Sequence, residues 1–258
     1  MENKELTFKN LVTENQIKSN IENSIFSPWK NYILDTLKNS DTNNQITKHG
    51  NKYTTLDDIR YYRINPASKL LKKANQHKKK YSKSLENNEI LALIHPFFRN
   101  LYDKSEYKNK KLKKINNYIN QIDFVCKNID SNIDIILVDT LHSYTGCTHK
   151  LLESGHFKDV FFSFHNQGYL IDESNLNILK NKDIYLAGGY NGYCLFNFSY
   201  ELVTQNFKKN KLKFVNNLIY SDSDNMNEMN KTKKIKNPFD STKFMPKKYL
   251  INSRLLCN

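Results

Sequence analysis

The chain has 258 residues, of which 38% are hydrophobic, and it carries a formal net charge of +14. No apolar run approaches the roughly 20 residues that a membrane-spanning helix needs, so we expect no membrane partner. Residues 1–20 lack the apolar stretch of a secretory signal, and they contain acids and no Arg, unlike a transit peptide. We therefore expect a protein that works in the compartment where it is made.

The N-terminal part of the chain is basic and partly helical. Residues 26–37 predict an amphipathic helix that holds the single tryptophan, Trp29. Residues 67–74 predict a second helix, because Pro66 stands where a helix begins. From Arg60 to Lys83 the chain has nine positive charges and no acid.

Short apolar runs then alternate with helical patterns. Apolar runs that predict strands occupy residues 90–95, 133–139, 160–164, 183–187 and 214–220, and helical patterns occupy residues 111–126, 145–154 and 191–207. Gly155 follows the second of these helices, where a helix C-cap is expected. This alternation predicts a three-layer α/β fold with a mainly parallel sheet of about four or five strands.

The chain therefore divides into three predicted parts. Residues 1–85 form a basic extension, residues 86–220 the α/β domain, and residues 221–258 a basic tail with too little apolar content to fold alone.

Several chemically capable residues follow the predicted strands, where ligands bind in parallel sheets. They are His95, Asp139, His142, His165, Asn166, Gly188, Gly189 and Cys194. Cys194 would lie in the first turn of a helix, where the helix dipole lowers the pKa of a thiol. Gly188, Tyr193 and Cys194 together resemble the nucleophile turn of isochorismatase-type cysteine hydrolases, although His95 stands where that family has Asp. A thiol hydrolase is therefore the alternative function.

No cofactor is expected. His142, His149 and His156 recur every seven residues near Cys147, but this is not the spacing of a zinc motif. Residues 188–192 match neither a Walker nor a Rossmann phosphate loop, and a tight turn explains their glycines equally well. We expect neither a metal nor a small-molecule substrate.

The positive charge is concentrated at the two ends of the chain. Residues 1–85 carry 16 Lys and Arg against 8 Asp and Glu, residues 86–206 carry 12 against 14, and residues 207–258 carry 12 against 4. The 36 Lys and 37 Asn indicate A/T-rich codons, but such a bias acts along the whole chain and does not create this contrast. The flanks are therefore predicted to contact a polyanion.

Lysines and arginines that neutralise phosphates release counterions, and aromatic rings among them stack on unpaired bases. The residues predicted to contact RNA phosphates are Arg60, Arg63, Lys72, Lys73, Lys78, Lys79, Lys80, Lys83, Lys233, Lys234 and Lys236. The aromatic residues among the flanks are Tyr53, Tyr61, Tyr62, Tyr81, Phe239, Phe244 and Tyr249.

Three stretches of the α/β part also resemble a known family. Residues 133–141 resemble a strand that reads D-L-V-I-V-L-D-P-L in the small-subunit ribosomal protein S-two family, residues 160–166 occupy the place of its next strand, and residues 184–200 are similar to its Y-P-I-P-G-N-D segment and the helix after it. The resemblance implies a three-layer α/β protein that binds ribosomal RNA and neighbouring small-subunit proteins and catalyses nothing.

Together these features predict a structural, RNA-binding component of a mitochondrial small ribosomal subunit, located in the matrix and acting in translation. A cytoplasmic location and a free RNA-binding module remain alternatives.

Overall fold

A computed structural model describes most of the α/β part of the chain. The described residues are 19–20, 22–25, 27, 69–96, 108–141, 144, 148–164, 168–189, 191, 193–219 and 235–258, without the side chains of 108–116 and 119. The predicted helix at 26–37, with Trp29, lies outside these residues except for Ser27.

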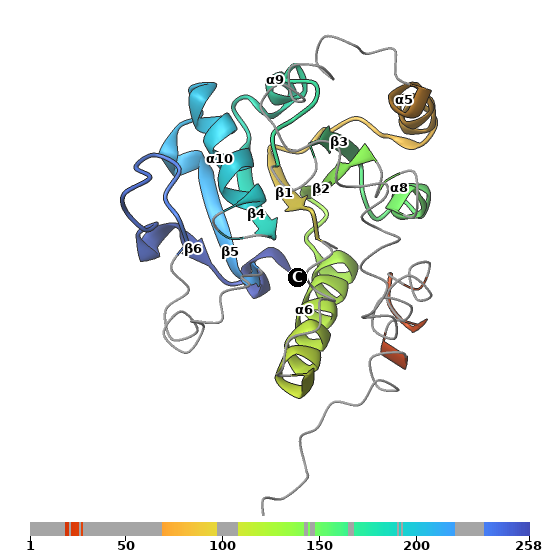
Figure 1. Cartoon of the computed structure of the whole chain (residues 1–258), viewed down its shortest axis with the longest axis horizontal. Coiled ribbons are helices and arrows are strands. Elements are labelled where there is room, and N and C mark those ends of the chain that lie inside the picture. The colour runs from red at the N-terminus through yellow and green to blue at the C-terminus, as the bar shows by residue number, and fades with distance from the viewer. Residues whose placement is uncertain are drawn as a thin grey trace, which may run out of the picture.

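One parallel sheet organises the described part of the chain. Its six strands follow the order β3-β2-β1-β4-β5-β6, which runs from right to left in Figure 1. The strands are β1 (Glu89–Ile94), β2 (Ile133–Thr140), β3 (Asp159–Ser163), β4 (Asp183–Gly188), β5 (Leu212–Ile219) and β6 (Leu250–Ile251). Every pairing is parallel, which confirms the predicted α/β class.

Most helices lie where the sequence pattern predicted them, but their lengths differ from the prediction. They are α5 (Lys69–Tyr81), α6 (Lys108–Asn128), α8 (His149–Glu153), α9 (Asn175–Leu179) and α10 (Cys194–Thr204), with 3-10 turns η4 (Lys209–Lys211), η5 (Lys247–Tyr249) and η6 (Ser253–Leu256). Helix α5 continues to Tyr81, beyond the predicted end at residue 74, because it packs on β3 and α8. Helix α9 is too short to produce a helical pattern and was not predicted.

Both faces of the sheet are buried, which explains why the strands read as continuous apolar runs. Alternate residues of β1 enter two separate cores: Leu91 and Leu93 pack with α5, α6 and α8, and Ile90 packs with α9 and α10. The helices thus form the two outer layers of a three-layer fold.

The strand order creates a switch point between β1 and β4. The chain builds outward from β1 through β2 to β3, then returns to place β4 on the other side of β1. In sheets with this strand order, ligands bind beyond the carboxyl ends of the strands at the switch point.

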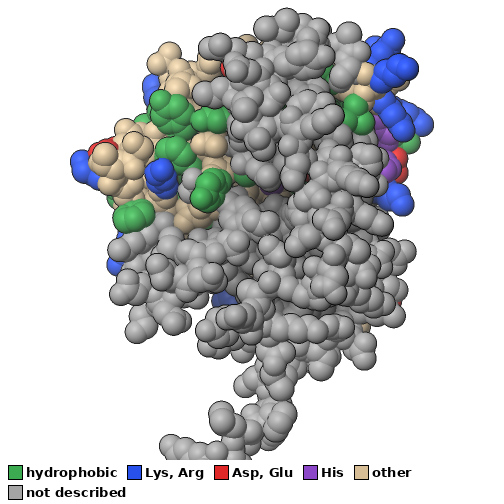
Figure 2. Space-filling view, viewed as in Figure 1, with side chains coloured by type: hydrophobic (Ala, Val, Ile, Leu, Met, Phe, Trp, Pro, Cys, Tyr) green, Lys and Arg blue, Asp and Glu red, His purple; other side chains and the backbone are tan. Residues whose placement is uncertain are grey.

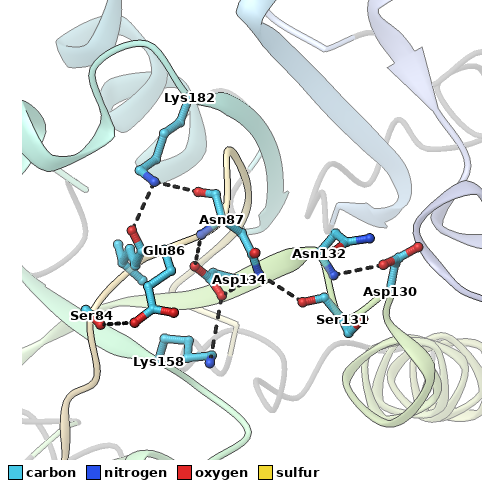
Figure 3. A network of polar contacts seen from close by, with 10 residues as sticks. Ser84, Glu86, Asn87, Asp130, Ser131, Asn132, Asp134, Lys158 and Lys182 are labelled. Atoms are coloured by element: carbon cyan, nitrogen blue, oxygen red, sulfur yellow. Dashed lines mark hydrogen bonds and ion pairs between the residues drawn. The ribbon is translucent and has the colours of Figure 1, made fainter.

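The amino ends of the strands are joined by a network of polar contacts (Figure 3). The buried carboxylate of Asp134, in β2, accepts hydrogen bonds from Asn87 N at 3.0 Å and Asn87 Nδ2 at 2.9 Å, with Lys158 Nζ at 4.0 Å. The ammonium of Lys182 donates to the carbonyls of Leu85 and Asn87. This edge therefore ties the linker between α5 and β1 to the starts of β2, β3 and β4.

The second half of the C-terminal tail lies against the body rather than apart from it. Ile235 and Met245 are buried beside α10, Leu256 is buried on the opposite face, and β6 pairs with β5. Each of these side chains fills a place on a core that already exists, so the tail needs no core of its own. None of the described helices is both long and apolar enough to cross a membrane.

Candidate functional site

His95 occupies the carboxyl end of β1, at the switch point. Its backbone has a φ of 40°, a left-handed conformation that is uncommon outside glycine, and its side chain is 4% exposed. His95 Nε2 lies 2.5 Å from the hydroxyl oxygen of Ser163, at the end of β3. Ser163 was not among the residues predicted from the sequence, although its position at a strand end was an available signal.

Asp139 lies on the neighbouring strand β2, and both oxygens of its buried carboxylate accept hydrogen bonds within the fold. It accepts hydrogen bonds from Thr148 Oγ1 at 2.5 Å and from Thr140 N at 2.8 Å. The pairing of Ile94 with Val138 brings His95 and Asp139 to the same level of the sheet. Three other predicted residues of this edge, His142, His165 and Asn166, lie outside the described residues, as does Cys147 of the histidine series.

Gly188 allows β1 and β4 to approach closely at the switch point. Its φ is +102°, and a Cβ atom there would stand 2.0 Å from the carbonyl oxygen of Ile94. The next residue, Gly189, donates its N–H to the same oxygen at 2.9 Å. Close packing in a tight turn therefore accounts for Gly188.

Cys194 is the first residue of α10 and so lies in the first turn of a helix, as the sequence predicted, although the helix begins three residues later than expected. Its side chain is 3% exposed and belongs to the apolar core between the sheet and α10. The backbone of Gly168 packs so closely that a Cβ atom there would lie 2.2 Å from the Cys194 carbonyl oxygen. In such surroundings a cysteine acts as a small apolar side chain.

Helix α5 carries a strongly basic outer surface and contains no acidic residue. The exposed residues of this surface, called here the α5 lysines, are Lys69, Lys72, Lys73, Lys79, Lys80 and Lys83, the last of which follows the helix. Leu71 and Ala74, on the opposite side of the helix, are buried against the body. Figure 2 shows the corresponding lysines at the upper right, beside a histidine.

Lys78 differs from the other lysines of α5, because it points toward the sheet. Its ammonium lies 3.1 Å from the carboxylate of Asp159 and 5.1 Å from the centre of the Phe161 ring. Ser82 Oγ donates to the same carboxylate at 2.5 Å. Lys78 therefore anchors the helix, and its neighbours provide the outward charge.

A second anchor of α5 is His77, which joins the helix to α8. Its Nδ1 lies 2.8 Å from the Tyr144 hydroxyl and its Nε2 lies 2.8 Å from Glu153 Oε1. Burial, together with the charges of Asp159 and Glu153, raises the pKa of Tyr144. The hydrogen bond from His77 lowers the pKa of Glu153.

Lys236 lies on the opposite side of the fold from α5, beside α10. Its ammonium is 4.5 Å from the centre of the Phe196 ring, and its backbone N–H contacts Asn191 Oδ1 at 3.4 Å. The remaining residues predicted to contact RNA, Arg60, Arg63, Lys233 and Lys234, lie outside the described residues.

The structure describes two histidines of the seven-residue series. His149 Nδ1 lies 3.1 Å from the Tyr144 carbonyl oxygen. His156 is partly buried, and this burial lowers its pKa. Within the described part of the chain, no group of three or more His, Cys, Asp or Glu side chains is placed to hold a metal.

Comparison of the chain with protein-family models, with curated proteins and with solved structures found no match.

Proposed function

We propose that this protein binds RNA through the α5 lysines. The observation that carries the proposal is a helix without acidic residues whose lysines face outward while Lys78 and His77 hold it to the body. As the resemblance to the ribosomal protein S-two family implies, the protein would do so as a structural component of a mitochondrial small ribosomal subunit, in contact with ribosomal RNA and neighbouring proteins.

The geometry of α5 suits a polyanion. Lys72 and Lys80 are separated by about 12 Å along the helix axis, so the α5 lysines form a row of charge rather than a point. Because the helix is anchored, little conformational freedom is lost when phosphates bind to it. The contacts are made to phosphates, so we expect sequence-independent, salt-sensitive affinity.

Paired lysine substitutions test the proposal. A Lys72→Gln, Lys73→Gln variant should weaken RNA binding and lower the slope of log affinity against log salt by about 0.7 for each lost contact with a single strand. A Lys127→Gln, Lys180→Gln variant loses the same charge from exposed positions in the near-neutral segment 86–206 and should retain most of the slope. Equal slopes for the two variants would overturn the assignment to α5.

Sedimentation tests the ribosomal part of the proposal. The native protein should travel with small ribosomal subunits through a gradient at high salt. Binding to RNA without co-sedimentation would favour the alternative of a free RNA-binding module.

A thiol hydrolase built on Cys194 remains the second candidate, because Cys194 begins the helix that follows β4 at the switch point. A small electrophile at neutral pH separates the two functions. Since Cys194 is 3% exposed, we expect it to react more slowly than the half-buried Cys257. Fast labelling that is lost in a Cys194→Ser variant would favour the hydrolase.

A further inference from the structure

We propose that the outer face of α10 is a stacking platform for unpaired bases, and that it binds single-stranded RNA. The inference rests on the proposed RNA-binding function and adds a second site at the other side of the sheet from α5. The platform consists of Tyr193, Phe196 and Tyr200, with Lys236 beside it.

Phe196 and Tyr200 are four residues apart and lie on one face of α10, and Tyr193 is the N-cap residue directly before the helix. Tyr193 is 67% exposed and Tyr200 is 43% exposed. The rings of Phe196 and Tyr200 are 6.0 Å apart and inclined by only 19°, so they present neighbouring flat surfaces in nearly the same orientation.

The core does not require these rings. The apolar contacts of α10 with the sheet come from its opposite face, through Leu195, Phe198 and Leu202. An outward row of aromatic side chains is therefore an addition to a helix that is already amphipathic. Contiguous exposed apolar side chains of this kind mark interaction sites. Figure 2 shows hydrophobic side chains gathered at the left, over α10 and the C-terminal strands.

The charge beside the rings favours a nucleic acid over a protein. Lys236 places its ammonium 4.5 Å from the centre of the Phe196 ring, and an ammonium has three N–H donors, so it can also reach a phosphate. The single acidic residue of α10, Glu201, is buried and accepts a hydrogen bond from Leu170 N. Flat rings next to a cation match the base-and-phosphate repeat of a single strand.

Base stacking has a direct test. A short single-stranded RNA that contains 2-aminopurine should lose fluorescence when its bases stack on the wild-type protein. A Phe196→Leu, Tyr200→Leu variant should bind this strand about 10-fold more weakly. Its affinity for duplex RNA should stay unchanged, because duplex bases are not available for stacking.

Two further variants are controls. They show whether weaker binding by the double variant results from misfolding or from a general loss of exposed apolar surface. Tyr200→Phe keeps the ring and should retain binding. Leu255→Ala removes another exposed apolar side chain, 74% exposed and next to Leu256, which packs in the core on the α6 side of the sheet, and it should also bind as the wild type does.

The outcomes separate this inference from the function on which it rests. If the double variant binds the single strand as the wild type does, or loses duplex and single-strand affinity equally, the platform is excluded while the effect of the α5 variants stands. If the double variant instead loses only self-association or a protein contact, the face is a protein interface and the inference is wrong. If the wild type binds no RNA, both proposals fail.

Discussion

The ammonium of Lys78 lies 3.1 Å from the carboxylate of Asp159, and this ion pair joins the basic helix α5 to the edge strand β3. Both side chains are largely buried, with 20% and 9% exposed. The pair divides the lysines of α5 into one that holds the helix and others that face outward. This internal ion pair therefore determines which lysines of α5 remain available to a partner.

Removing the anchor should loosen the fold measurably. In Asp159→Ala, Lys78 and Ser82 lose their acceptor, and we expect the free energy of unfolding to fall by about 2 kcal/mol. Urea denaturation measures the change. Asp240→Asn, which breaks the exposed pair with Lys243, is the matched control and should leave the midpoint unchanged. Equal effects would show that the Asp159 anchor contributes no more than a surface pair.

The close approach at the switch point predicts a severe effect at Gly188. Alanine there would combine a left-handed backbone with a Cβ atom 2.0 Å from Ile94 O, so we expect a loss of at least about 3 kcal/mol. Gly155 also has a positive φ, but the nearest atom to an added Cβ is Lys83 Nζ at 3.8 Å. Gly155→Ala should therefore cost only about 1 kcal/mol. Thermal unfolding of the two variants would contradict this account if their midpoints agreed.

Tyr144 should make stability depend on pH in the alkaline range. Its pKa is raised by burial, so the unfolded chain releases this proton first, and stability should fall as pH rises above about 10. Tyr144→Phe loses the hydrogen bond with His77, which costs about 1 kcal/mol at neutral pH, but it cannot ionise. Urea midpoints at rising pH should therefore converge for the two proteins. If the plots of urea midpoint against pH stay parallel, Tyr144 is not the source of the alkaline loss of stability. Tyr169 and Tyr185, whose pKa values are also raised, are present in both proteins and would then account for it.

The network at the amino edge should depend on Asn87. Its side-chain amide donates to Asp134 Oδ1 and to the Ser131 carbonyl, both at 2.9 Å, so Asn87→Ala leaves a buried carboxylate with fewer donors (Figure 3). We expect a loss of about 2 kcal/mol in urea denaturation. Asn132→Ala is a suitable control, because Asn132 contributes its backbone N–H to Asp130. A stable Asn87 variant would show that Lys158 and the backbone N–H of residue 87 satisfy Asp134 without the side-chain amide.

Local patterns of hydrophobicity were sufficient to predict most strands. Because both faces of the sheet are covered, residues 90–94 and 133–138 are apolar without interruption apart from Asp134, and such a run is visible without knowledge of its neighbours. The pattern failed where an element depends on distant contacts. The pair of residues that form β6 is a strand only because β5 provides its partner.

The aromatic platform on α10 could likewise not be predicted from the local sequence pattern. The helical pattern at 191–207 was recognised, but its aromatic residues could not be sorted into those that face the core and those that face outward. The spacing of Phe196 and Tyr200 was the available signal. Whether a ring in such a helix is buried depends on which side the sheet covers, and the helix itself does not contain that information.

The α/β class and the concentration of positive charge at the ends of the chain follow from the sequence alone, because hydrophobic period and charge are properties of neighbouring residues. The strand order, the inward turn of Lys78 and the position of Lys236 over Phe196 are determined by folding. Each depends on a contact between residues far apart in the chain, and the free energy of such a contact exists only once the core has brought its partners together.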